Sequence, residues 1–190
     1  MDTLPLEPGR GILCLRPNVS RAEALLEFSE AGLLSRLAHG PLRRLVDIYI
    51  PYRLYRVELL DGQSREVVHL ALDSVRASFD VYAFPAVPQG PELRMVDTRN
   101  HPEPCVPEAQ ARDEVLQRGR RLAYERGLLR IRDLRLSAEL VMSDFYIPYW
   151  VGFFGRGAVA SQVRVLDAVR RCMEGDKLCA FVREWLAGSA

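Results

Sequence analysis

The chain contains one six-residue phrase twice. DIYIPY at Asp47–Tyr52 returns, changed only at its second position, as DFYIPY at Asp144–Tyr149. A second match follows each copy in the same order, LDSVR at Leu72–Arg76 and LDAVR at Leu166–Arg170. Two collinear matches favour an internal duplication, so we expect a chain built from two similar units.

A helix is predicted ahead of each copy of the phrase. Ser20 and Glu23 fit a capping box, and the apolar spacing after them predicts a helix that ends at Gly40. In the second unit Pro107 is expected to open a helix and Gly127 to close it. Both units therefore predict the order helix, long strand, turn, returning strand.

The long strands are indicated by alternating apolar residues, from Val46 to Leu54 and from Val141 to Phe153. Beyond Pro51 the apolar row moves to the opposite parity. Proline lacks the amide that a central ladder requires and therefore belongs at an edge or a bulge. We expect a bent strand that lets the sheet curl.

Each returning strand, Glu66–Asp73 and Gln162–Asp167, ends at the aspartate of the second repeated phrase. A carboxylate at that position can accept hydrogen bonds from the backbone amides that follow it. We therefore expect Asp73 and Asp167 to fix the turn out of the strand rather than to act in catalysis.

A glycine pattern follows the second long strand. Gly155–Ala160 matches GxGxxA, which binds dinucleotides only where a helix opens at the glycines within a βαβ unit. The corresponding place in the first unit is a plain turn at Asp61–Gly62, and the residues after Ala160 alternate as in a strand. A hairpin turn is the preferred interpretation.

The predicted organisation is α+β: two similar helix-plus-antiparallel-sheet units in one pseudo-twofold assembly, either as one continuous sheet or face to face. Residues 1–84 form the first unit, 85–107 a linker whose prolines argue against regular structure, and 108–190 the second unit with a last helix capped by Asp176.

Composition excludes several classes of function. The formal net charge of +1 gives no bias towards nucleic acid or membranes, and the arginine-rich stretch 117–135 is interpreted as a solvated helix face. The N-terminal residues show no positive start followed by a long apolar run, and no stretch reaches about 18 uncharged apolar residues, which predicts a cytoplasmic protein. The cysteines lack CxxC spacing and predict reduced, mostly buried thiols with no metal site. No cofactor and no catalytic residue are predicted.

The order of the elements resembles the small PepSY-like and cystatin-like modules of bacterial proteins. The resemblance rests on Tyr49–Tyr52 with Leu72–Val75 and on Tyr146–Trp150 with Leu166–Val169, and extends over about two thirds of the chain. It implies a fold and a binding or regulatory role. The glycine that often follows the aspartate phrase in such modules is absent, since arginine stands there in both units.

The candidate binding residues are aromatic residues with a polar end and an apolar body, which are suited to an aromatic-lined cleft between the units. His69 joins them because it is the histidine that falls inside a predicted strand, although a packed, hydrogen-bonded core role is favoured over a general base; His39 and His101 are expected to be exposed to solvent. The set is Tyr49, Tyr52, His69, Tyr146, Tyr149 and Trp150.

Three functions stay open. The first is a non-enzymatic module that binds a protein or peptide partner at the edge of the bent strand. The second is a small-molecule-binding protein or enzyme with a pocket lined by Tyr49, His69 and Tyr146. The third is a homodimer formed by pairing of strand edges.

Overall fold

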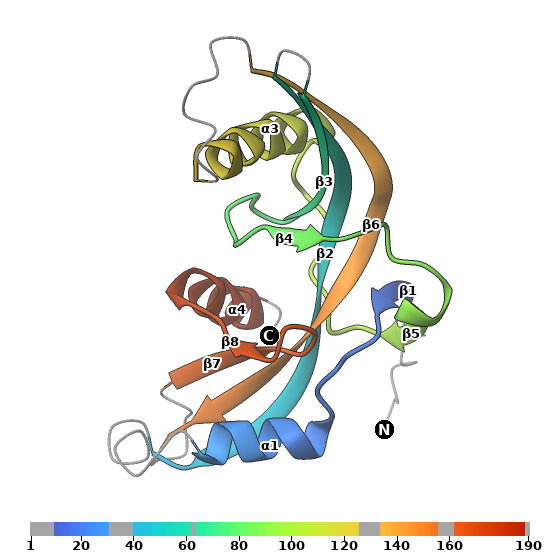
Figure 1. The fold of residues 1–190 in the computed structure, drawn as a ribbon. Coiled ribbons are helices and arrows are strands. Elements are labelled where there is room, and N and C mark those ends of the chain that lie inside the picture. Colours follow the sequence, from blue (N-terminus) through green and yellow to red (C-terminus); the bar gives the residue numbers. More distant parts are fainter. Residues whose placement is uncertain (1–9, 31–39, 62–63, 126–133, 156–161, 189–190) are drawn as a thin grey trace.

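The computed structural model describes residues 10–30, 40–61, 64–125, 134–155 and 162–188. Within these ranges the chain forms a curled mixed sheet of eight strands with three α-helices, which confirms the α+β class (Figure 1). The strands are β1 (Arg10–Leu15), β2 (Leu42–Asp61), β3 (Ser64–Asp73), β4 (Tyr82–Phe84), β5 (Leu93–Thr98), β6 (Arg135–Phe154), β7 (Gln162–Asp167) and β8 (Cys172–Met173). The helices are α1 (Arg21–Glu30), α3 (Glu108–Glu125) and α4 (Asp176–Gly188), with a short 3-10 helix at Gly90–Glu92.

Two long antiparallel strands, β2 and β6, form the centre of the sheet. They pair along almost their whole length, with Ile50 opposite Ile147. Strand β3 pairs with the second half of β2, and β7 pairs with the second half of β6. The full order is β4-β3-β2-β6-β1-β5, with β7 and β8 attached beside β6. Of the two expected arrangements, one continuous sheet is therefore the observed one.

The long strands bend, as their prolines predicted. The β2–β6 register shifts at two places between Tyr52 and Tyr55, and Asp144 on the facing strand has a positive φ of 44°. Aspartate tolerates this left-handed conformation better than most residues, which suits it to a bulge. In Figure 1 the paired strands curve through the length of the molecule, with α3 near one end and α1 at the other.

The repeated prolines lie where the central ladder needs no amide. The carbonyls of Pro51 and Pro148 accept hydrogen bonds from the amides of Ser74 and Ala168, at 2.8 and 3.1 Å, on the sides away from the β2–β6 ladder. The N–H and C=O of a strand residue point to the same side, so each ring replaces an outward-pointing amide.

The prediction that the bent strand of the repeated phrase forms a free edge of the sheet is wrong. Strand β2 lies between β3 and β6, and β6 lies between β2 and the strands β1 and β7. Among the described strands, the path through the sheet ends at β4 and β5.

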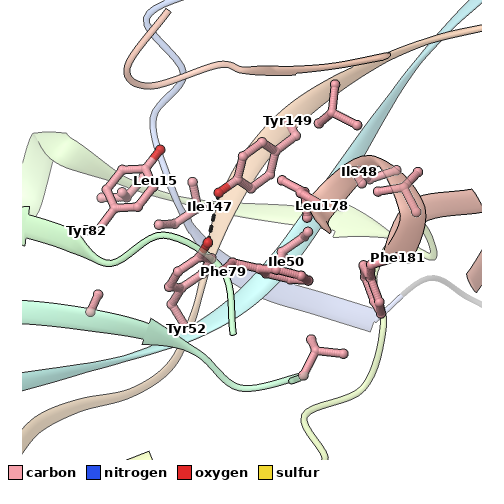
Figure 2. Packing of buried hydrophobic residues seen from close by; sticks show 14 of the residues in the cluster. Leu15, Ile48, Ile50, Tyr52, Phe79, Tyr82, Ile147, Tyr149, Leu178 and Phe181 are labelled. Atoms are coloured by element: carbon pink, nitrogen blue, oxygen red, sulfur yellow. Dashed lines mark hydrogen bonds between the residues drawn. The ribbon is translucent and has the colours of Figure 1, made fainter. Parts of the chain in front are cut away.

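Apolar residues on both faces of the sheet form the core. On one face Ile48, Ile50 and Tyr52 pack in one cluster with residues of α4 and β4, among them Leu178 and Tyr82 (Figure 2). A second group packs beneath α3 and contains Tyr55 and Val57, after the register shift. The parity change predicted beyond Pro51 therefore corresponds to a change of face along β2.

The helix starts follow the predicted caps. The Ser20 amide donates to the Glu23 carboxylate at 2.8 Å, and the Glu23 amide donates to the Ser20 hydroxyl at 3.3 Å, which completes the capping box of α1. Helix α3 begins directly after Pro107. Helix α4 begins at Asp176, so this residue is the first of the helix, and the predicted cap has no side-chain hydrogen bond among the described contacts. The predicted end of the first helix before Gly40 and the closure at Gly127 fall on residues outside the described ranges.

The proline-rich segment 85–107 contains more structure than expected. Strand β5 lies within it and pairs with β1 over six residues, from Arg10 opposite Thr98 to Leu15 opposite Leu93. The prediction of no regular structure is wrong there because no proline occurs between Pro91 and Pro102. Among the described helices, none is long and apolar enough to cross a membrane.

Candidate ligand-binding pocket

The two tyrosines that close the repeated phrase meet in the core. Tyr52 and Tyr149 are each 1% exposed, and their hydroxyl oxygens lie 3.0 Å apart in a hydrogen bond (Figure 2). Burial raises the pKa of both hydroxyls well above the ordinary value. Both therefore remain protonated at neutral pH, and each has its polar end engaged by the other.

The tyrosines three residues earlier lie in a separate cluster. Tyr49 and Tyr146 pack with Ile12 and Cys14 of β1. The Tyr49 hydroxyl donates to Asp47 at 2.9 Å, and burial, followed by this contact, raises its pKa.

His101 packs beside this cluster. Its ring lies 5.3 Å from that of Tyr146 in an edge-to-face contact, and its side chain is only 6% exposed. The expectation that His101 is solvent-exposed is wrong, because the segment after β5 runs back along β2, where the Tyr49 amide donates to the Asn100 carbonyl at 2.8 Å.

The last two predicted site residues lie apart from each other. The half-buried Trp150 donates its indole N–H to the Val19 carbonyl at 2.9 Å, which fixes the ring against the segment before α1. His69 is also half-buried but lies on β3, opposite Arg56 of β2 and Phe84 of β4. The predicted hydrogen bond of His69 has no counterpart among the described contacts, since no partner of its ring is found within the described ranges.

A pocket of about 460 Å³ opens between the start of α1, the middle of the sheet and β5. Its volume falls within the range of small-molecule sites. Tyr49, Tyr149 and Trp150 line it, whereas Tyr52, His69 and Tyr146 do not. We call it the Trp150 pocket; its lining residues are Pro17, Asn18, Val19, Ser20, Arg21, Glu23, Asp47, Tyr49, Arg94, Pro148, Tyr149, Trp150 and Ala168.

Charged side chains of both signs surround the Trp150 pocket. Asp47 accepts from Tyr49, and Glu23 caps α1 and contacts Arg171. Arg94 comes from β5 and was missed by the sequence analysis, which expected no regular structure there. The signal that was present is the proline-free run between Pro91 and Pro102.

The repeated aspartates act as predicted. Asp73 is 1% exposed, and its two carboxylate oxygens accept from five successive backbone amides, those of Val75, Arg76, Ala77, Ser78 and Phe79. Asp167 is fully buried and accepts from the amides of Val169 and Arg170 at 2.7 Å and from the Tyr82 hydroxyl. The predicted turn-fixing role is confirmed for both carboxylates.

Asp167 also belongs to a group with the ligand types of a metal site. One ligand atom each from Asp167, Cys172 and Glu174 lies within 4.8 Å of the others. The Asp167 carboxylate already accepts three hydrogen bonds, so we interpret the group as structural. The sequence prediction of mostly buried thiols holds for Cys14 and Cys179 but is wrong for Cys172 and Cys105, which are exposed.

Glu174 makes the stability of the protein depend on pH. Burial, followed by the nearby Asp167 carboxylate, raises the pKa of Glu174 from 4.5 to about 7. The folded protein therefore binds this proton more tightly than the unfolded chain, and the resulting stabilisation is present below pH 4.5 and is lost as the pH rises through 7.

Replacing Glu174 with glutamine is therefore expected to raise the free energy of unfolding at pH 8 by about 1–2 kcal/mol, after allowance for solvent screening. At pH 5 the variant and the wild type are expected to be nearly equal. Urea denaturation at both pH values measures the difference. A Glu174→Gln variant less stable than the wild type at pH 8 would contradict this reasoning.

The glycine pattern at Gly155–Ala160 does not lie in a βαβ unit. Strands β6 and β7 on either side of it are antiparallel neighbours, with Phe154 opposite Gln162. The hairpin interpretation is thereby supported, although residues 156–161 lie outside the described ranges.

Comparisons with protein-family models, curated proteins and solved structures gave no match to this chain. The residues around the Trp150 pocket therefore carry the functional argument.

Proposed function

We propose that the protein is a non-enzymatic binding or regulatory module that holds a small molecule in the Trp150 pocket. The observation that carries this proposal is the pocket itself, which has a volume of about 460 Å³ and is lined by three of the predicted aromatic residues. Binding is favoured over catalysis because the carboxylates in the lining are already engaged: Asp47 by Tyr49, and Glu23 by the start of α1 and by Arg171.

Native mass spectrometry of the protein purified gently from its own cells tests this function. We expect an added small mass that is lost on denaturation. Asn18 is exposed and lines the pocket, so Asn18→Trp places bulk at its mouth and should abolish the added mass. Gln110→Trp places the same bulk on the exposed surface of α3 and should retain it. A bare chain, or a mass that Asn18→Trp leaves unchanged, argues against the pocket as the binding site.

We also infer that the two units arose by internal duplication and are related by a pseudo-twofold axis near Ile50 and Ile147. Corresponding residues make corresponding hydrogen bonds, which supports this inference. In each unit the residue after the repeated aspartate donates to the proline of the repeated phrase and accepts from the valine that precedes the helix. The bonds are Ser74 to Pro51 and Val106 to Ser74 in one unit, and Ala168 to Pro148 and Val19 to Ala168 in the other.

Backbone strain supports the same relationship. Ala77 and Arg171 occupy the same place after the repeated aspartates, and both adopt a positive φ, of 54° and 56°. This conformation is uncommon for residues other than glycine, so two independent occurrences at matching places are unexpected. The resemblance to PepSY-like and cystatin-like modules stays a prediction.

The two units differ where the pocket lies. Trp150 and Arg53 follow the repeated phrase at equivalent positions, and both donate to the carbonyl of the valine before the helix, at 2.9 and 2.7 Å. Arg53 also contacts Asp144, whereas Trp150 lines the pocket. The ion pair of Arg53 with Asp144 in one unit thus corresponds to the pocket-lining Trp150 in the other. This difference is expected if one copy acquired a binding role after duplication.

A protein partner at β5 is the second candidate function, because apolar side chains are exposed there. Leu13 and Met95 lie opposite each other across β1 and β5 and are 36% and 66% exposed. Strand β5 ends the sheet path, so it offers an edge to an added strand, including one from a second copy. Sedimentation of the wild type against Met95→Glu tests self-association: a dimer that the variant disrupts supports it, and a monomeric wild type removes the homodimer.

A further inference from the structure

We propose that the Trp150 pocket selects an anionic small molecule, with a carboxylate or phosphate group held by Arg94 and Arg21 and an apolar ring packed against Trp150. This inference rests on the proposed function and specifies its ligand class.

The guanidinium of Arg94 has a hydrogen-bond donor without a partner among the described residues. This donor is the buried Nε. An unpaired buried donor is costly, and no ion pair of this guanidinium occurs among the described residues, although the half-buried side chain lines the pocket. The guanidinium lies beside the Cys14 thiol, whose pKa burial raises despite the arginine, so no thiolate neutralises the charge at neutral pH.

Both carboxylates of the lining already accept hydrogen bonds. Asp47 accepts from the Tyr49 hydroxyl at 2.9 Å and from the Asn100 side-chain amide at 3.5 Å. Glu23 accepts from Ser20 and also contacts Arg171, which lies outside the lining.

Arg21 supplies a second available cation. It is exposed in the first turn of α1, and no ion pair of its side chain occurs among the described residues. The amino end of a helix adds a partial positive charge, which favours a bound anion beside Arg21. Glu23 is paired with Arg171, and Asp47 keeps its charge while it accepts from two neutral donors, so the lining offers two arginines against one carboxylate without an ion pair among the described residues.

The apolar side of the pocket is suited to a ring. The indole N–H of Trp150 is occupied by Val19, which leaves the ring fixed in place as a flat surface beside Pro148 and Ala168. Arginine forms bidentate contacts with carboxylate and phosphate groups, so a charged group at one end and a ring at the other match the lining.

Tryptophan fluorescence titrations with four probes test the inference. The probes share one ring and differ in charge: phenyl phosphate, benzoate, benzyl alcohol and benzylamine. The titrations use a Trp185→Phe background, which leaves Trp150 as the reporter, since the chain has two tryptophans. We expect saturable binding of phenyl phosphate or benzoate at least tenfold tighter than that of benzyl alcohol or benzylamine.

Three further variants test the role of Arg94. Loss of one charge-assisted contact is expected to weaken anion binding about tenfold or more in Arg94→Gln, with partial recovery in Arg94→Lys. Arg120→Gln removes the same charge from the exposed surface of α3 and should change nothing. Thermal unfolding of each variant verifies that the fold persists.

Equal affinity for benzylamine or benzyl alcohol, an unchanged affinity in a folded Arg94→Gln variant, or the absence of saturable anion binding would overturn the inference. Failure of the anionic ligand class can be distinguished from failure of the proposed function. If native mass spectrometry finds a neutral or cationic molecule that Asn18→Trp displaces, the pocket binds a ligand but the anionic class is wrong.

Discussion

Replacing Asp73 with alanine is expected to destabilise the protein by about 3–5 kcal/mol, because the change leaves several buried backbone amides without their acceptor. Asp73 accepts hydrogen bonds from five successive backbone amides. Because the site is only 1% exposed, water cannot replace the carboxylate as the acceptor for all of them. The turn that it organises also carries Ser74, whose carbonyl accepts from the residues before α3. The loss should therefore affect both the turn and the seating of the helix.

Urea denaturation measures the effect, with Asp97→Ala as the matched control. Asp97 lies exposed on β5, so its replacement removes the same charge without removing a buried acceptor. We expect the control to remain within about 0.5 kcal/mol of the wild type. A loss below about 1 kcal/mol in Asp73→Ala would mean that the turn holds without its carboxylate.

The central tyrosine pair is expected to show strong coupling in a double-mutant cycle. Tyr52→Phe or Tyr149→Phe alone leaves one buried hydroxyl unpaired and should cost about 1–3 kcal/mol. The double variant removes both hydroxyls, so its loss should be clearly smaller than the sum of the two single losses.

Denaturation of the four proteins gives the coupling free energy. Additive losses would show that the 3.0 Å contact between the hydroxyls contributes little beyond packing. Tyr52→Ala is expected to cost more, about 3–5 kcal/mol, because it opens a cavity in the core. A fully stable Tyr52→Ala variant would contradict the placement of this side chain.

Local patterns predicted much of this fold. The capping box at Ser20, the helix start after Pro107 and the returning strands that end at Asp73 and Asp167 were all visible because each depends on neighbours in sequence. The bend beyond Pro51 could be predicted for the same reason, because a proline and a shift in the alternation of apolar residues are both signals within a few positions of the chain.

Contacts between distant segments were not predictable in the same way. Pairing of β2 with β6 places the repeated phrases side by side, which makes their strands central rather than edges. This pairing also puts Tyr52 and Tyr149 out of reach of solvent. Which strands pair with each other depends on the packing of the whole sheet, and no residue of the repeated phrase specifies its partner strand.

The sequence predicted some of the residues that line the Trp150 pocket but not others. Tyr49, Tyr149 and Trp150 were found from their residue type, but Arg94 and Asn18 reach the pocket only because β1 pairs with β5 and the chain then passes to α1. His69 was included as a titratable residue in a strand, and the fold places it on β3, outside the pocket lining. Residue type alone therefore identified the wall of the pocket but not its charged groups.

A crystal structure of the protein purified from its own cells, with its bound mass verified by native mass spectrometry, shows whether the Trp150 pocket holds an anionic ligand. We expect continuous density in the Trp150 pocket, with a planar group against Trp150 and an anionic group within hydrogen-bond distance of Arg94. Ordered solvent alone in that pocket, with the added mass bound elsewhere on the molecule, would contradict this expectation.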